Sequence, residues 1–262
     1  MKPLRRLLFG LLTIVVLASC NYPQPDSPEP CGQKHLVRDM LSQSLSSTWA
    51  GWIGDLSGTR PVILDNQAQT ISTRFSYAMF SGQSNARAFD YVLSLAQAWL
   101  APQQIEVRPY TYQDAEKSYT WKNLVLTFPG VSKPDEVIYL TAHLDSILSH
   151  DGDPMQLAPG ADDNASGDAA LLEALRLLRY YQFERTIKVV FFSGEEEFAA
   201  GSKKFVAAGL PGQTIGVLNL DMIAYQNGDQ PIVQLHSGTL PQSQEISNCF
   251  IQTTLAYKLN LI

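Results

Sequence analysis

Three short apolar segments with helical patterns between them constrain the fold of this chain more than any other feature. The segments are residues 136–142 (EVIYLTA), 187–192 (IKVVFF) and 215–220 (IGVLNL), and each is as short and as rich in apolar residues as a buried strand. Between them, residues 167–181 form an amphipathic helical pattern, and a second helix is expected over 196–208. This alternation predicts an α/β fold of three layers, α/β/α, around a mixed, mainly parallel central sheet.

Further elements are expected on both sides of this pattern. Residues 84–100 are predicted to form a helix that stops before Pro102, and residues 121–128 alternate like a strand that ends at a Pro-Gly turn. Residues 232–235 and 242–257 are predicted as a strand and a helix. The length of 262 residues fits one large domain, expected over 35–262. A net charge of −6 and no evident basic face argue against nucleic acid as a partner.

The N-terminus differs in composition from the rest of the chain. Residues 1–19 combine a basic start with a short apolar stretch, which indicates an export signal. Residues 17–20 (LASC) resemble the lipobox of bacterial lipoproteins, which implies cleavage before Cys20 and a lipid on its sulfur. A plain signal peptide with an incidental cysteine is the alternative. Residues 20–34 are a proline-rich tether. The expected location is the bacterial cell envelope, lipid-anchored at the outer membrane and facing the periplasm.

Two cysteines remain once Cys20 is assigned to the anchor. In an oxidising compartment Cys31 and Cys249 could form a disulfide, or they could be two independent thiols. Their spacing does not decide between these alternatives.

Candidate metal ligands follow each of the three buried strands. In open α/β sheets, ligand sites form beyond the carboxyl ends of the strands, so these side chains are expected to converge with the acidic turn 159–167 (PGADDNASG). Singly, Asp163 and its neighbours could cap a helix, and His143 could be a hydrogen-bonded core residue. Together they favour a metal site. The residues that follow the strands are His143, Asp145, Glu195, Glu196 and Asp221.

Carboxylates with an imidazole and no nearby cysteine suit zinc, or a harder cation such as manganese or cobalt. Two metal ions that share one carboxylate would accommodate this much negative charge and would serve hydrolysis. An acid outside the coordination shell must then take a proton from water.

Four stretches carry a resemblance to a known family: HLDS at 143–146, PGADDNASG at 159–167, GEEEFAAGS at 194–202 and NLDM at 219–222. They are similar to the co-catalytic zinc aminopeptidases related to bacterial leucyl aminopeptidase, a family that includes aminopeptidase S, glutamate-type carboxypeptidases and glutaminyl cyclases. The resemblance extends from about Arg74 to the C-terminus.

The resemblance implies a role for each of the zinc ligands. His143 and Asp221 would hold one zinc ion, Asp163 would bridge both ions, and Glu196 would bind the second. The peptide bond between Asp163 and Asn164 is expected to be cis.

The neighbouring acids also receive roles from the resemblance. Glu195 would be the general base, and Asp145 would hydrogen-bond His143 and fix its tautomer. Glu197 has no role in the family and is expected to be a solvated residue at a helix start.

One departure from the family pattern concerns the second zinc, which takes a late histidine in the family. Of the four histidines, His35 and His150 are poorly placed, and His236 is the one substitute considered. The chain is therefore expected to be C-terminally incomplete, with an uncovered sheet edge and weak or absent activity.

Three functions follow from these observations. The first is an aminopeptidase that hydrolyses peptides with two zinc ions, the second is a single-zinc glutaminyl cyclase, and the third is a non-catalytic surface domain that binds a metal or a peptide.

Overall fold

A computed structural model describes residues 34–148, 151–226 and 233–259 of the chain. The predicted signal segment, the anchor Cys20 and the tether up to residue 33 lie outside these residues, as does Cys31 of the possible Cys31–Cys249 disulfide. Cys249 itself is disulfide-bonded. None of the helices in the described ranges is long and apolar enough to cross a membrane.

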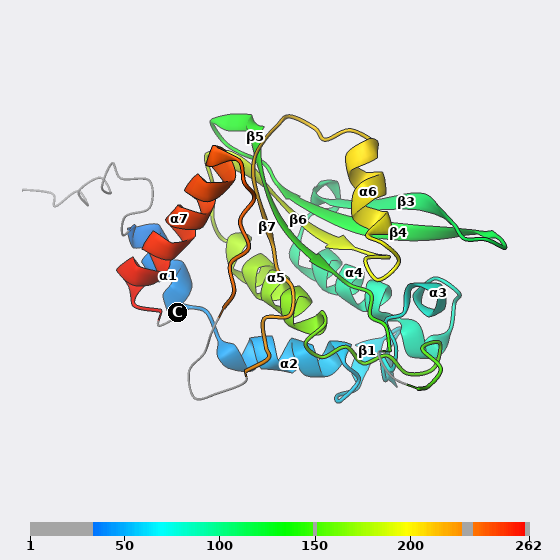
Figure 1. The fold of residues 1–262 in the computed structure, drawn as a ribbon. Helices are drawn as coiled ribbons and strands as arrows, with labels where there is room; N and C mark the ends of the chain where they lie inside the picture. The colour runs from blue at the N-terminus through cyan, green and yellow to red at the C-terminus, as the bar shows by residue number, and fades with distance from the viewer. Residues whose placement is uncertain (1–33, 149–150, 227–232, 260–262) are drawn as a thin grey trace, which may run out of the picture.

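A five-stranded sheet forms the centre of the fold (Figure 1). Its strands, in the spatial order β3-β4-β6-β5-β7, are β3 (Ile105–Gln113), β4 (Ser118–Phe128), β6 (Arg185–Phe192), β5 (Lys133–His143) and β7 (Gln213–Asn219). β4 is antiparallel to both of its neighbours, whereas β5 is parallel to β6 and to β7. The mixed, mainly parallel sheet predicted from the three apolar segments is confirmed.

Helices cover both faces of this sheet (Figure 1). α4 (Ala88–Trp99) and α5 (Ala165–Leu178) pack on one face, with α2 (Ser46–Leu56) against α5, and α6 (Ala200–Ala207) covers the other. On β6, Val189 and Phe191 join the larger core, while Val190 joins a smaller one with Phe205 of α6. A strand that is apolar on both faces in this way belongs in the interior of an α/β/α fold.

The remaining helices and strands lie outside the five-stranded sheet. They are α1 (His35–Ser42), the antiparallel pair β1 (Val62–Leu64) and β2 (Gln67–Gln69), the short helix α3 (Ser76–Met79), a 3-10 turn at Pro102–Gln104 and α7 (Pro241–Tyr257). α7 lies against β7, which is an edge strand of the five-stranded sheet. The predicted helix over 84–100 is a 3-10 turn, Ser84–Ala86, followed by α4.

Two predictions about local structure are wrong. Residues 233–235 form no strand, although the sequence favoured one over 232–235. α6 begins at Ala200 instead of residue 196, because Phe198 and Ala199 adopt left-handed backbone angles, with φ of 59° and 56°. Glu197 is therefore not at a helix start. It lies half-buried in a turn, where its carboxylate accepts a hydrogen bond from the Tyr112 hydroxyl.

Candidate metal centre

His143, Asp163 and Asp221 converge beyond the carboxyl ends of the strands. His143 is the last residue of β5 and is buried; its Nε2 lies 3.1 Å from Oδ1 of Asp163 and 3.5 Å from Oδ1 of Asp221. One ligand atom from each residue lies within 4.8 Å of the others. The convergence predicted from the strand ends is therefore present for these three residues.

Asp163 reaches this position through the turn that opens α5. The Asp163–Asn164 peptide bond is cis, as the family resemblance implied. Asn164 caps α5 by accepting a hydrogen bond from the Gly167 amide, and its side-chain amide donates to the Leu220 carbonyl. The cap therefore also ties α5 to the residue before Asp221.

Asp162, adjacent to Asp163, has a different function in the structure. Its carboxylate accepts hydrogen bonds from the backbone amides of Ala224 and Tyr225, at 2.8 and 3.1 Å. These bonds hold the segment after Asp221 against the acidic turn. Of the two acids in this turn, Asp163 is the one that lies beside His143 and belongs to the three-residue cluster.

Asp145 is fully buried and links His143 to the turn between β6 and α6, residues 194–199, which we call the glutamate turn. Its two carboxylate oxygens accept hydrogen bonds from the backbone amides of Glu195 and Glu196, at 3.1 and 3.2 Å. Nδ1 of His143 lies 3.2 Å from the Asp145 carbonyl oxygen and 3.8 Å from the carboxylate. The shorter contact of His143 Nδ1 is thus with the Asp145 carbonyl oxygen, and the carboxylate of the predicted side-chain bond lies farther away. An Nδ1–H that donates to this carbonyl leaves the Nε2 lone pair free for a cation.

The concentration of carboxylates at the centre favours a bound cation. Burial lowers the pKa of His143, but the carboxylates of Asp145, Asp163 and Asp221 raise it by more, so that it lies well above its usual range. Burial and the negative charge of Asp163 raise the pKa of Glu196 to about 7. The centre offers one imidazole nitrogen and several carboxylate oxygens, and few positive charges lie nearby to balance these carboxylates. Such a donor set fits zinc.

A cavity of about 310 Å³ opens beside the centre. His143, Asp221 and Glu195 line it. Glu195 is exposed, but partial desolvation of its carboxyl and the nearby carboxylates of Asp145 and Asp221 raise its pKa. Its other walls are mostly apolar: Tyr139, Phe192, Phe205, Val206, Leu210 and Val217.

Two of the candidates lie outside the three-residue group. Glu196 is close enough to Asp163 to interact electrostatically, yet it does not share the 4.8 Å cluster. His236 is exposed and is likewise absent from that cluster. Sequence reasoning considered Asn164 as part of a helix cap and expected a cis peptide bond before it. It gave no role to Arg74, whose guanidinium donates hydrogen bonds to the Pro159 and Gly160 carbonyls of the acidic turn.

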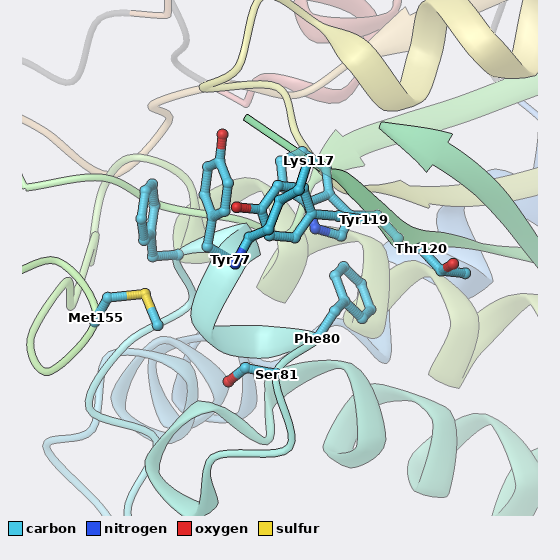
Figure 2. Close-up of a pocket in the computed structure, with 9 residues that line it drawn as sticks. Tyr77, Phe80, Ser81, Lys117, Tyr119, Thr120 and Met155 are labelled. Carbon is cyan, nitrogen blue, oxygen red and sulfur yellow. The ribbon is translucent and has the colours of Figure 1, made fainter. Parts of the chain in front are cut away.

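Behind the glutamate turn lies an aromatic pocket of about 600 Å³ (Figure 2). Figure 2 shows Tyr77 and Phe80, from α3 and the residue after it, beside Tyr119 of the β3–β4 hairpin. Trp121 forms part of the wall, and a Cβ on Gly194 would lie 2.8 Å from its ring. The first residue of the glutamate turn must therefore be glycine, which also tolerates its φ of 68°.

The glutamate turn and the acidic turn lie in a region that matches a known protein family. The sequence profile of peptidase family M28 matches residues 123–259, slightly more than half of the chain. A probable zinc metalloprotease of the fungus Pyrenophora tritici-repentis is 29% identical over 177 residues, which cover 62% of this chain and 36% of the relative. A probable leucine aminopeptidase of Arthroderma otae is 29% identical over 176 residues, covering 62% and 44%. The chain thus spans less than half the length of these curated relatives.

Solved structures with the same fold include LapB of Legionella pneumophila, with a TM-score of 0.55 and 22% identity over 78% of this chain and 51% of that one. A glutaminyl cyclase of Tannerella forsythia has a TM-score of 0.51 and 21% identity over 69% and 62%. At these identities the likeness concerns the fold alone. The profile match, with a zinc-type donor set at the strand ends, shows that the chain belongs to peptidase family M28, a family of zinc peptidases.

Proposed function

We propose that this chain carries the catalytic centre of a zinc aminopeptidase that removes N-terminal residues from peptides. The observation that carries the proposal is the convergence of His143, Asp163 and Asp221 at the mouth of a cavity that also contains Glu195. A metal-type donor set beside a water-accessible acid is the arrangement that hydrolysis needs.

In this proposal the apolar cavity accepts the side chain of the N-terminal residue. Phe192, Phe205 and Val217 supply walls without charge, which favour an apolar side chain. The volume of about 310 Å³ is enough for one such residue and too small for a long peptide.

His143, Asp163 and Asp221 would hold a zinc ion, with His143 Nε2 as the nitrogen ligand. Bound zinc polarises a carbonyl and lowers the pKa of water. Glu196 would hold a second zinc, with Asp163 between the two sites, because Asp163 lies 3.1 Å from His143 and interacts electrostatically with Glu196.

Glu195 would act as the general base. Its carboxylate is accessible from the cavity, and its raised pKa lets it accept a proton from water and return it to the leaving amine. Asp145 would fix the position of Glu195, because its carboxylate binds the Glu195 backbone amide.

The test is release of p-nitroaniline from leucine p-nitroanilide by the zinc-loaded protein, with zinc content measured in parallel. Glu195→Gln is expected to lower kcat by about 100-fold or more while zinc content stays the same. Glu106→Gln, at an exposed position on β3, is the matched control and should leave kcat unchanged. Equal kcat for Glu195→Gln and the parent would refute the assigned base.

The same preparation separates the alternative functions. Pyroglutamate formation from glutaminyl peptides, without release of p-nitroaniline, would replace the aminopeptidase with a glutaminyl cyclase. Zinc binding with neither reaction would leave a non-catalytic domain that binds a metal or a peptide.

We also propose that Cys20 is lipidated and anchors the protein at the outer membrane, facing the periplasm. The LASC sequence that ends the apolar N-terminal segment supports this proposal. Palmitate labelling and membrane fractionation of the parent and of Cys20→Ser test it. A Cys20→Ser protein that fractionates with membranes like the parent would contradict it.

A further inference from the structure

Arg74 is an arginine with no exposed surface that donates hydrogen bonds to four backbone carbonyls. Its Nε donates to Leu144 at 2.8 Å, Nη1 to Leu56 at 2.9 Å and Pro159 at 2.5 Å, and Nη2 to Gly160 at 2.9 Å. A planar guanidinium presents its donors in a fixed fork, so these carbonyls are held at fixed relative positions.

Three of the four carbonyls belong to the segments that carry candidate zinc ligands. Leu144 directly follows His143, whereas Pro159 and Gly160 begin the turn that leads to Asp163. One side chain thus connects the end of β5 to the acidic turn through backbone carbonyls.

The backbone of Arg74 joins the same two segments. Its carbonyl accepts from the Ser146 amide at 3.3 Å, and its amide donates to the Ala158 carbonyl at 3.4 Å. The Ser146 hydroxyl also donates to Ala158, at 2.7 Å.

Gly160 permits the close approach of the guanidinium. A Cβ at this position would lie 2.9 Å from Nη2 of Arg74 and 2.1 Å from the Asp163 carbonyl oxygen, and its φ is 46°. The turn is therefore shaped around the guanidinium as well as around Asp163.

Lysine at position 74 could not form the same set of hydrogen bonds. Its single ammonium nitrogen offers three donors at one point, whereas the four carbonyls here are bound by three separate nitrogens of Arg74. Lysine would keep the positive charge near Asp168, Asp145 and Asp163, which are the carboxylates that interact most strongly with Arg74. Arg74→Lys thus keeps the positive charge and removes the hydrogen bonds that fix the carbonyls.

We propose that Arg74 is a positioning residue that sets the spacing of His143 and Asp163 before zinc binds. This inference rests on the proposed function in one respect, namely that zinc occupies the centre. It predicts that the protein preorganises the zinc site, because the bonds from Arg74 to these carbonyls are made entirely by protein atoms.

The first experiment compares Arg74→Lys with Arg60→Lys. Arg60 has an exposed side chain paired with Asp55, and within the described residues its side chain forms no hydrogen bond or ion pair with the two ligand segments. Zinc dissociation constants are measured by competition with a chromophoric chelator, after circular dichroism shows that each variant is folded. Arg74→Lys should weaken zinc binding about 10- to 100-fold, the usual effect of removing a group that orients metal ligands, and Arg60→Lys should not change it. A folded Arg74→Lys protein with the parent's zinc affinity overturns the proposal.

The second experiment uses the parent protein and decides the matter if Arg74→Lys does not fold. Hydrogen exchange is followed at the amides of Ser146 and Ala165, which donate to the carbonyls of Arg74 and Gly160. Preorganisation predicts that both amides are protected without zinc and change little when zinc is added. Protection that develops only after zinc is added would mean that the metal orders these segments, and the proposal would be wrong.

Neither readout depends on peptide hydrolysis. An inactive protein that binds zinc tightly through an Arg74-dependent site would refute the proposed aminopeptidase and leave this inference intact. Peptidase activity together with equal zinc affinity in the parent and in Arg74→Lys would support the aminopeptidase and refute the positioning role of Arg74.

Discussion

Replacing Asp168 by asparagine should stabilise the zinc-free protein increasingly as the pH rises. Asp168 lies on α5 with no exposed surface, and neither of its carboxylate oxygens accepts a hydrogen bond from the described residues. Burial raises its pKa from 3.8 to about 8, although the positive charges of Arg74 and His143 oppose the shift.

The sign of the effect follows from proton binding. The folded state keeps a proton on Asp168 up to about pH 8, whereas the unfolded chain releases it near pH 3.8. Between these values the folded state binds more protons, so that ionisation favours unfolding and stability falls as the pH rises through this window. Asparagine does not titrate and removes this loss.

The magnitude follows from the same two pKa values. A separation of about 4 units, at about 1.4 kcal/mol each, gives a limiting loss of about 6 kcal/mol above pH 8. At about pH 5 the unfolded chain is already ionised and the folded state is not, which gives a loss of about 2 kcal/mol. The asparagine amide adds a constant contribution from its own unpaired donors. The change between about pH 5 and pH 9, about 4 kcal/mol, is therefore the quantity to measure.

The assay is urea unfolding of parent and Asp168→Asn, both in excess chelator, at pH values across this range. Asp135→Asn, at an exposed position on β5, is the matched control. The stability difference between Asp168→Asn and the parent should grow by about 4 kcal/mol in favour of the variant from about pH 5 to pH 9. A difference that stays constant, or that turns against the variant at high pH, would show that Asp168 is ionised in the folded state and would refute the reasoning.

Three further predictions concern the turns around the centre. Gly194→Ala should destabilise the protein by at least about 2 kcal/mol in urea unfolding, because its Cβ would meet the Trp121 ring and the Tyr110 hydroxyl at 2.8 Å; a change below about 0.5 kcal/mol would contradict this contact. Phe198→Gly should stabilise it by about 1 kcal/mol, since Phe198 has a φ of 59° and a relative exposure of 84%, and a loss of stability would mean that the ring makes a needed contact. Asp162→Ala should cost about 1–2 kcal/mol and weaken zinc binding in chelator competition, because two backbone amides beyond Asp221 lose their acceptor; unchanged affinity would separate Asp162 from the site.

The central strands could be predicted because burial on both faces demands uninterrupted apolar runs. β5, β6 and β7 each agree with a predicted segment to within a few residues. β3 was missed because it is an edge strand with a polar sequence, IEVRPYTYQ, whose residues alternate between half-buried and exposed. The apolar residues near 232–235 led to a wrong strand prediction. Apolar residues form a strand only where a partner strand is available, and residues 233–235 form none.

The convergence of the acids was predictable from topology, because the carboxyl ends of parallel strands meet at one edge. The turn after β6 was not, since its course depends on left-handed angles at Phe198 and Ala199 that the residue types disfavour. That turn places Glu197 against Tyr112, behind the centre, and leaves Glu195 at the cavity. Three adjacent glutamates therefore occupy three different environments. The family resemblance distinguishes the three, but it places Glu197 in solvent at a helix start instead of against Tyr112.

The contacts that hold the centre together were hidden from the sequence for a more general reason. Asp145 binds backbone amides 50 and 51 residues away, and Arg74 binds carbonyls 70, 85 and 86 residues away. Side-chain bonds to backbone groups leave no pattern in the partner, because every residue type carries the same amide and carbonyl. Ligand residues can be recognised by their chemistry, whereas the residues that position them become visible only when the fold brings the chain segments together. Arg74 and Asp145 share this property, and both act on the backbone beside a candidate ligand or base. If zinc affinity falls with the loss of the Arg74 guanidinium, the backbone on that side of the site, and not the ligand side chains alone, determines how well the centre binds metal.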